Sequence, residues 1–140
     1  MLEKFNGREL IEALLTNETL ADTFDEKQFW AKFSATSWSH LLIYAPKYAD
    51  KCTKWKEIKI DEWICLLSRQ PQFSDKCKKF KSFKVKDWFE LFKSRPEFVN
   101  LCPDDIYDKF SKGHWTYLEK KYPSIFEDKH ILSTLRKLAK

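Results

Sequence analysis

Glycine is nearly absent from this sequence of 140 residues, which contains only Gly7 and Gly113. Phosphate-binding loops and the nucleophile elbow of serine hydrolases both need several glycines at fixed spacing, so the sequence excludes both kinds of site. No apolar run approaches the ~20 residues that span a bilayer. The N-terminus mixes acidic and basic residues and lacks the apolar stretch of a secretory signal. We therefore expect a cytoplasmic protein with no membrane partner.

Metal-binding and catalytic patterns are also missing. None of the four cysteines pairs with another at the CxxC spacing of zinc knuckles and thiol redox motifs. The three histidines occupy unrelated positions, and the acid pairs Asp61-Glu62 and Asp104-Asp105 fall where helices are expected to begin. We therefore expect no metal, no cofactor and no enzymatic activity.

Aromatic residues make up 16% of the chain, with six Trp and twelve Phe, so large flat side chains should dominate the core. The net charge of +5 is unevenly distributed. Residues 1–50 hold 5 basic and 8 acidic residues, residues 51–100 hold 13 and 7, and residues 101–140 hold 8 and 6. The middle of the chain is therefore the region in which an anionic partner is to be sought.

A tandem repeat of about 25 residues organises the sequence. Four Trp residues are spaced by 25, 25 and 27, and a Pro follows each by eight residues. These markers are Trp38, Trp63, Trp88 and Trp115, with Pro46, Pro71, Pro96 and Pro123. An aromatic residue precedes each Trp by eight: Trp30, Trp55, Phe80 and Tyr107. In the first three copies an aromatic and a Cys follow the Pro: Tyr48, Phe73 and Phe98, and Cys52, Cys77 and Cys102.

The clearest units, WICLLSRQPQFSDKC and WFELFKSRPEFVNLC, resemble the W-x-x-L-L-x-x-x-P-x-F-x-x-x-C tandem repeats of uncharacterised bacterial proteins. The resemblance covers roughly Trp30 to Lys129. It implies a repeat architecture and no particular activity. The fourth copy departs from the pattern at Glu119, Ile125 and Lys129.

Each repeat predicts two short helices and a connector. Trp63, Leu66 and Leu67 lie at i, i+3 and i+4, which is one face of a helix. Pro71 ends that helix and opens a second one, which runs to Cys77. The connector 78–86 should point Phe80, Phe83 and Val85 inward; a short strand over FKSFKVK is the second interpretation.

Helices this short need neighbours, so the predicted fold class is an all-α, solenoid-like stack of short helical repeats with atypical capping helices at both ends. We expect one domain, 1–140, with an N-terminal cap at 1–29, repeats at 30–125 and a C-terminal capping helix at 126–140. Asn6 and Glu9 resemble a capping box for the first helix. Asp128 is expected to cap the last helix, which carries Ile131, Leu132, Leu135 and Leu138 on one face.

Lysine-rich connectors are the predicted binding surface. We expect them to align on one side of the stack and to bind an anionic partner. The candidate residues are Lys54, Lys56, Lys59, Lys78, Lys79, Lys81, Lys84 and Lys86. A plain solvated face is the other interpretation of these lysines. The repeat-phased aromatics between them are assigned to the core.

The predicted function is a non-catalytic protein–protein interaction module. Its size and basic character suit a phage or mobile-element inhibitor that blocks a bacterial defence effector, as anti-CRISPR proteins do. A protein partner is favoured, and direct nucleic-acid binding through the connectors is the alternative.

Overall fold

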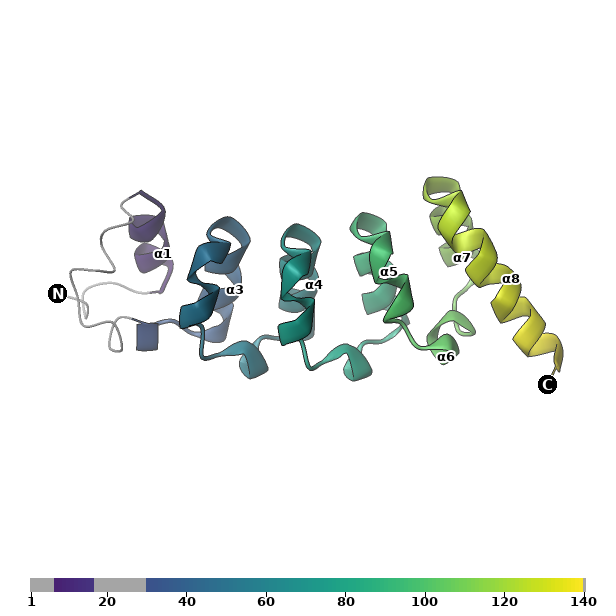
Figure 1. Ribbon diagram of the computed structural model, residues 1–140, viewed down its shortest axis with the longest axis horizontal. Coiled ribbons are helices and arrows are strands. Elements are labelled where there is room, and N and C mark those ends of the chain that lie inside the picture. The colour runs from purple at the N-terminus through teal and green to yellow at the C-terminus, as the bar shows by residue number, and fades with distance from the viewer. Residues whose placement is uncertain (1–6, 17–29, 140) are drawn as a thin grey trace. The chain divides into compact units, whose positions relative to one another are not determined.

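The computed structural model describes residues 7–16 and 30–139, and every regular element in those ranges is helical (Figure 1). The all-α prediction is confirmed. The chain divides into two compact units, Met1–Lys78 and Lys79–Lys140, and each is described by itself. We call them unit 1 and unit 2.

The four Trp residues lie on α-helices of identical length. Each helix begins three residues before its Trp and ends six residues after it. The helices are α3 (Ala35–Tyr44) and α4 (Ile60–Arg69) in unit 1, and α5 (Val85–Ser94) and α7 (Lys112–Lys121) in unit 2. The residue before the Trp is therefore the third helical residue and not the N-cap.

In α4, α5 and α7 that third residue still caps the helix, through its side chain, whereas in α3 the Ser34 hydroxyl is the cap and accepts from the Ser37 N–H. The Lys59 backbone N–H donates to Glu62 Oε1 at 3.1 Å, and the Lys84 N–H donates to Asp87 Oδ2 at 2.8 Å. A carboxylate in the first turn also interacts favourably with the helix dipole. In α7 the same place is taken by His114, whose Nδ1 accepts from the Ser111 N–H at 3.0 Å.

Each Pro ends one helix and opens the next, as predicted. In each of the first three copies the second helix is a short 3₁₀ helix: η3 (Pro46–Lys51), η5 (Pro71–Lys76) and η7 (Pro96–Asn100). Phe73, Phe98 and the three repeat cysteines are buried beside them, while Tyr48 is half-buried. The Pro, aromatic and Cys positions that recur between copies are therefore part of the scaffold.

The connectors are short 3₁₀ turns, η4 (Trp55–Glu57) and η6 (Phe80–Ser82). The strand interpretation of FKSFKVK is wrong, because Phe80–Ser82 forms η6 and Val85 already begins α5. Phe83 is buried as predicted, whereas Phe80 and Val85 are only half-buried. In the fourth copy the connector is a short α-helix, α6 (Asp104–Tyr107).

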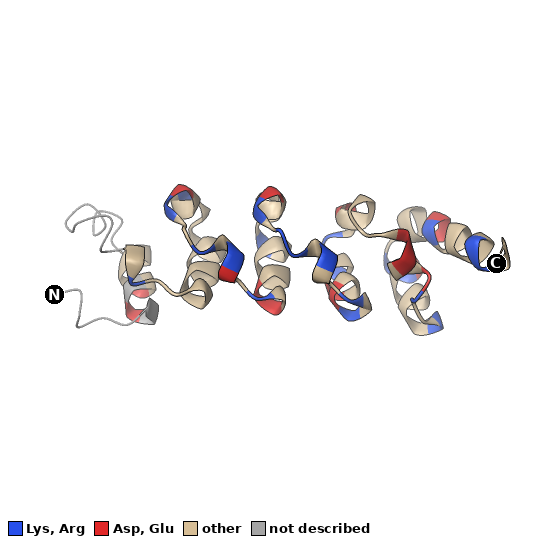
Figure 2. Ribbon diagram, turned by 90° about the horizontal axis from the view of Figure 1, so that it is seen from below, with Lys and Arg blue, Asp and Glu red and all other residues tan. Residues whose placement is uncertain are grey.

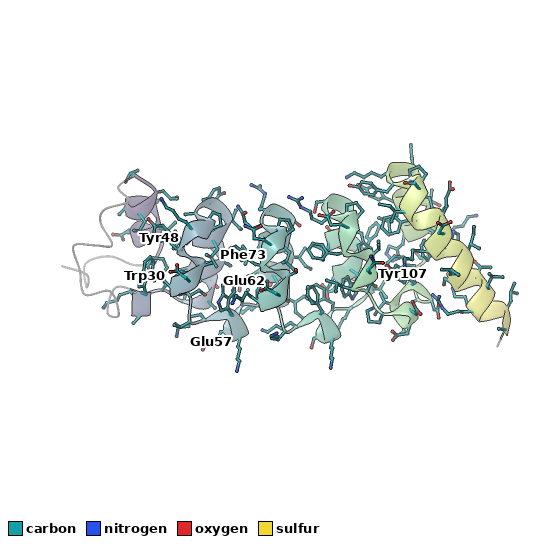
Figure 3. The ribbon with its side chains drawn as sticks, in the orientation of Figure 1. Trp30, Tyr48, Glu57, Glu62, Phe73 and Tyr107 are labelled. Atoms are coloured by element: carbon teal, nitrogen blue, oxygen red, sulfur yellow. The ribbon has the colours of Figure 1, made fainter. Side chains whose placement is uncertain are left out.

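A stacked ring pair recurs in all four copies and explains the eight-residue spacing. The aromatic that precedes the Trp by eight residues lies nearly parallel to the indole. Ring centroids are 5.2 Å apart for Trp30–Trp38, 5.8 Å for Trp55–Trp63, 5.5 Å for Phe80–Trp88 and 6.1 Å for Tyr107–Trp115. In unit 1 the same rings also contact the post-proline aromatic, as Figure 3 shows for Trp30 and Tyr48. Each connector is thus fixed onto the helix that follows it.

Helices of successive copies pack side by side within each unit. In unit 1, α1 (Gly7–Thr16) packs on α3, which packs on α4; Ile11 and Leu14 are buried. In unit 2, α5 packs on α7. The C-cap residue that follows a helix bonds back to the previous copy: Gln70 Nε2 donates to the Ile43 carbonyl at 2.9 Å, and the Tyr122 hydroxyl donates to the Lys93 carbonyl at 2.8 Å. Asn6, the predicted cap of α1, lies outside the described residues.

The last helix differs from its prediction in two respects. It is α8 (Pro123–Ala139), so it begins before residue 126, and Asp128 lies inside it rather than at its N-cap. Its buried residues are Phe126 and Ser133, whereas Ile131, Leu132, Leu135 and Leu138 are exposed. The four residues thus form an exposed apolar face, and α8 docks on α7 and α6 through its other face.

Candidate binding surface

The eight candidate lysines divide equally between the two units. Unit 1 carries Lys54, Lys56, Lys59 and Lys78, and unit 2 carries Lys79, Lys81, Lys84 and Lys86. All except Lys54 and Lys79 are exposed, and those two are half-exposed. Figure 2 shows lysine on each of the two connector turns.

Turn η4 holds Lys54, Lys56 and Lys59 in a fixed backbone. The Glu57 N–H donates to the Lys54 carbonyl at 3.0 Å, and the Ile58 N–H donates to the Trp55 carbonyl at 3.4 Å. Ile58 is fully buried next to the turn. The Lys59 backbone N–H then takes part in the cap of α4. The turn is therefore fixed to α4 both by this cap and by the stacking of Trp55 on Trp63.

A shallow depression of about 490 Å³ lies on this turn, lined by Thr53, Lys54, Trp55, Lys56 and Glu57. Lys54 Nζ lies 3.7 Å from Glu57 Oε2, an exposed pair that contributes little to stability. Trp55 is half-buried, with one part of its ring system against Trp63 and Phe73. Its assignment to the core is therefore only partly correct, because a Trp at this depression also reaches the surface.

Turn η6 repeats this arrangement in unit 2. The Ser82 N–H donates to the Lys79 carbonyl at 2.9 Å, and Phe80 stacks on Trp88. Lys81, Lys84 and Lys86 are exposed around it. Among the described residues, Lys54 is the one candidate lysine that forms an ion pair. The other seven ammonium groups meet no acidic side chain of the described chain.

The fourth connector reverses the sign of the charge. Helix α6 carries the exposed Asp104 and Asp105, and Figure 2 shows red on this segment of the ribbon. The lysine pattern therefore belongs to the η4 and η6 connectors and is not a property of the repeat itself. Residues that vary between copies on an otherwise constant scaffold are where repeat proteins place their specificity.

Histidine side chains in unit 2 have structural contacts that the sequence did not reveal. His114 forms a reciprocal cap with Ser111, accepting at Nδ1 and donating its N–H to Ser111 Oγ at 3.2 Å. His130 stacks on Trp115 with centroids 4.5 Å apart and contacts the Glu119 carboxylate through Nδ1. His130 thus packs α8 onto α7. Within residues 7–16 and 30–139, no three His, Cys, Asp or Glu residues form a group that could hold a metal ion.

The cysteines differ sharply in their surroundings, and this predicts their reactivity. Burial raises the pKa of the Cys102 thiol to about 12 and also raises the pKa of the Cys52 thiol, while Cys65 is exposed on α4. Because the thiolate is the reactive form, we expect a thiol reagent to label Cys65 rapidly at pH 8 and to label Cys52, Cys77 and Cys102 only after unfolding. Intact-mass measurement should show one label on the native chain and four in denaturant. Rapid labelling of Cys65→Ser would contradict the buried placement of the other three.

A second concave surface lies in unit 1, between α1 and α3. It is a groove of about 460 Å³ lined by Ile11, Glu12, Leu15, Thr36, Ser37, His40 and Tyr44. The sequence analysis did not identify it, because no motif marks its residues. Most of the exposed area of its lining is apolar, so the groove offers a surface for apolar packing and has no cluster of charges.

Comparisons with protein-family models, with curated proteins and with solved structures found no match. Helices long and apolar enough to cross a membrane do not occur in the described part of the chain. The class that the fold and surface define is an all-α helical-repeat protein with lysine-bearing connector turns.

Proposed function

We propose that this protein is a non-catalytic interaction module that binds an acidic protein surface through the lysines of η4 and η6. The observation that carries this proposal is that backbone turns of fixed structure bear lysine side chains without acidic partners. Seven of the eight lysines have no acidic partner within the described chain. The turns that carry them are already ordered by backbone hydrogen bonds and ring stacking, so binding would order little additional backbone.

The biological setting that we propose is inhibition of a bacterial defence effector by a phage or mobile-element protein, as in anti-CRISPR systems. The net charge of +5 and the concentration of basic residues at 51–100 support binding to an acidic surface. This proposal predicts that the captured partner loses its own activity in the complex.

Nucleic-acid binding is the second candidate, and one observation favours it. Trp55 reaches the surface beside Lys54 and Lys56 at the η4 depression. Single-strand binders combine exposed aromatic rings with cations in this way. If this function holds, mobility-shift titrations should give a log K that falls with log salt concentration, with a slope of about −0.7 per phosphate contact for single strands.

The test of the main proposal is capture from a bacterial lysate with the full chain immobilised. A variant carrying K56E, K59E, K81E and K84E reverses two exposed lysines on each connector. We expect it to lose the partner that the wild-type chain retains, because eight units of charge change where the acidic surface would dock. Captured proteins are identified by mass spectrometry.

The matched control carries K109E, K112E, K120E and K137E. These lysines are also exposed, and reversing them changes the net charge by the same amount. We expect this control to capture the same partner as the wild-type chain. Equal capture by both variants, or equal loss, would show that the connectors have no special role.

A further inference from the structure

The two connectors of unit 2 carry charges of opposite sign on the same side of the unit. Turn η6 bears the exposed Lys81 and is followed by the exposed Lys84, while helix α6 bears the exposed Asp104 and Asp105. Figure 2 shows blue on the first of these segments and red on the second, both on the face that is turned toward the viewer. We call η6, η7 and α6 together the unit 2 edge.

The 3₁₀ helix η7 joins the two charged connectors through side-chain contacts. The ring of Phe80 in η6 lies 6.4 Å from the ring of Phe98 in η7, centroid to centroid. The hydroxyl of Tyr107 in α6 donates to the carbonyl of Val99 in η7 at 2.7 Å. The unit 2 edge is therefore one packed surface, and a ligand that lies along it meets both signs of charge.

The acidic side chains of α6 are not neutralised by the cations around them. Asp104 Oδ1 lies 4.0 Å from Arg136 Nη1, but the Asp104 side chain is 73% exposed, and Arg136 Nη2 donates to Asp108 at 2.8 Å. Within the described chain, neither Asp105 nor the nearby Lys109 forms an ion pair. Three carboxylates thus share the charge of one guanidinium.

We propose that α6 selects the partner of this surface: a protein in which a basic region borders the acidic one is accepted, and nucleic acid is kept off the unit 2 edge. This inference rests on the proposed function and specifies the charge pattern of its partner. A nucleic-acid strand carries a negative charge at every phosphate, so a strand along the edge is attracted at η6 and repelled at α6. A protein can place acids opposite Lys81 and Lys84 and a base opposite Asp105, and like charges placed opposite each other suppress the wrong partner.

Titration of the full chain with a fluorescent oligo(dT) of about 15 nucleotides tests the exclusion of nucleic acid. Every chain in this series carries K56E and K59E, which reverse two exposed lysines at η4 and reduce binding by unit 1. Adding D104K and D105K should tighten binding by about 10-fold or more, and should steepen the slope of log K against log salt by about 1.4, because each new phosphate contact adds ~0.7. Asparagine at the same two positions should give a smaller gain, and circular dichroism verifies that each variant is folded.

The matched control carries E127K and D128K, which change the net charge equally but lie on α8 and not on the unit 2 edge. We expect its salt slope to stay unchanged and its affinity for oligo(dT) to rise by less than about 3-fold, through net charge alone. Equal gains in both variants would show that net charge decides, and no gain from D104K and D105K would show that α6 repels nothing. Either result would overturn the proposal.

The selection of a mixed-charge partner has its own readout, in fluorescence anisotropy with two peptides of equal length. One peptide is all Glu, and the other is a block of Glu followed by a block of Lys. The chain with native α6 should bind the two-block peptide more tightly, and the chain with D104K and D105K should bind the all-Glu peptide more tightly. Any other order of affinities would contradict the proposal. Capture of a partner through the connector lysines can succeed while this reversal fails, so the two proposals are tested separately.

Discussion

Trp88→Ala should remove about 3–5 kcal/mol from the free energy of unfolding of unit 2. Trp88 is 0% exposed, and its ring lies 5.2 Å from Phe83, 5.5 Å from Phe80 and 5.8 Å from Phe92, centroid to centroid. Truncation leaves three aromatic rings around a cavity that the short helices cannot close, because Phe80 and Phe83 are fixed by turn η6 and Phe92 by α5. Urea denaturation followed by circular dichroism measures the change.

Trp88→Phe separates packing from polarity at the same position. The Trp88 indole Nε1 is buried and has no hydrogen-bond partner among the described residues, so replacing the indole forfeits no hydrogen bond. We expect a loss of about 1–2 kcal/mol, well below that of the alanine variant. Tyr117→Ala, at an exposed ring of the same unit, should cost less than about 1 kcal/mol. If Trp88→Ala proved as mild as Tyr117→Ala, the stacked ring pair would not be the core of the repeat.

Asp108→Ala should cost about 2–3 kcal/mol, because one carboxylate holds α8 to α6. It accepts from Ser133 Oγ at 2.8 Å and from Arg136 Nε and Nη2 at 3.1 and 2.8 Å. Ser133 is 1% exposed, so its hydroxyl would lose its side-chain acceptor in a dry environment. The measurement is again urea denaturation of the full chain.

Two companions of Asp108→Ala make this prediction specific. Asp105→Ala removes an exposed acid from the same helix and should cost less than about 1 kcal/mol. The double variant Asp108→Ala with Arg136→Ala should be less damaging than the sum of its parts, because the two residues share the same bonds. Full additivity would mean that the Asp108–Arg136 pair does not hold α8 in place.

The repeat spacing was enough to predict the scaffold. The Trp, Pro and Cys periods placed the helices, the proline boundaries and the buried positions, because those features depend on contacts within one copy. What the spacing could not show was which face α8 buries. A helical wheel favours burying Ile131, Leu132 and Leu135, but the partner surface of α6 and α7 offers Asp108 and Trp115, which select Ser133, Arg136 and His130 instead.

The lysine connectors stay a prediction as a binding surface. Lysine composition selected them, and the structure adds that seven of the eight lysines have no ion pair within the described chain. The partial exposure of Trp55 could not be predicted, because its repeat phase equals that of Trp30, which is buried. The exposures of Trp30 and Trp55 differ because the two side chains have different surroundings, and the repeat period does not specify these surroundings.

Zero-length carbodiimide cross-linking of the wild-type chain to its captured partner tests the central claim most directly, since it joins lysine ammonium groups to carboxylates in contact. Mass spectrometry then identifies the joined residues. Our account predicts links from Lys56, Lys59, Lys81 or Lys84 to acidic residues of the partner. Links confined to Lys109, Lys112, Lys120 and Lys137 would contradict it.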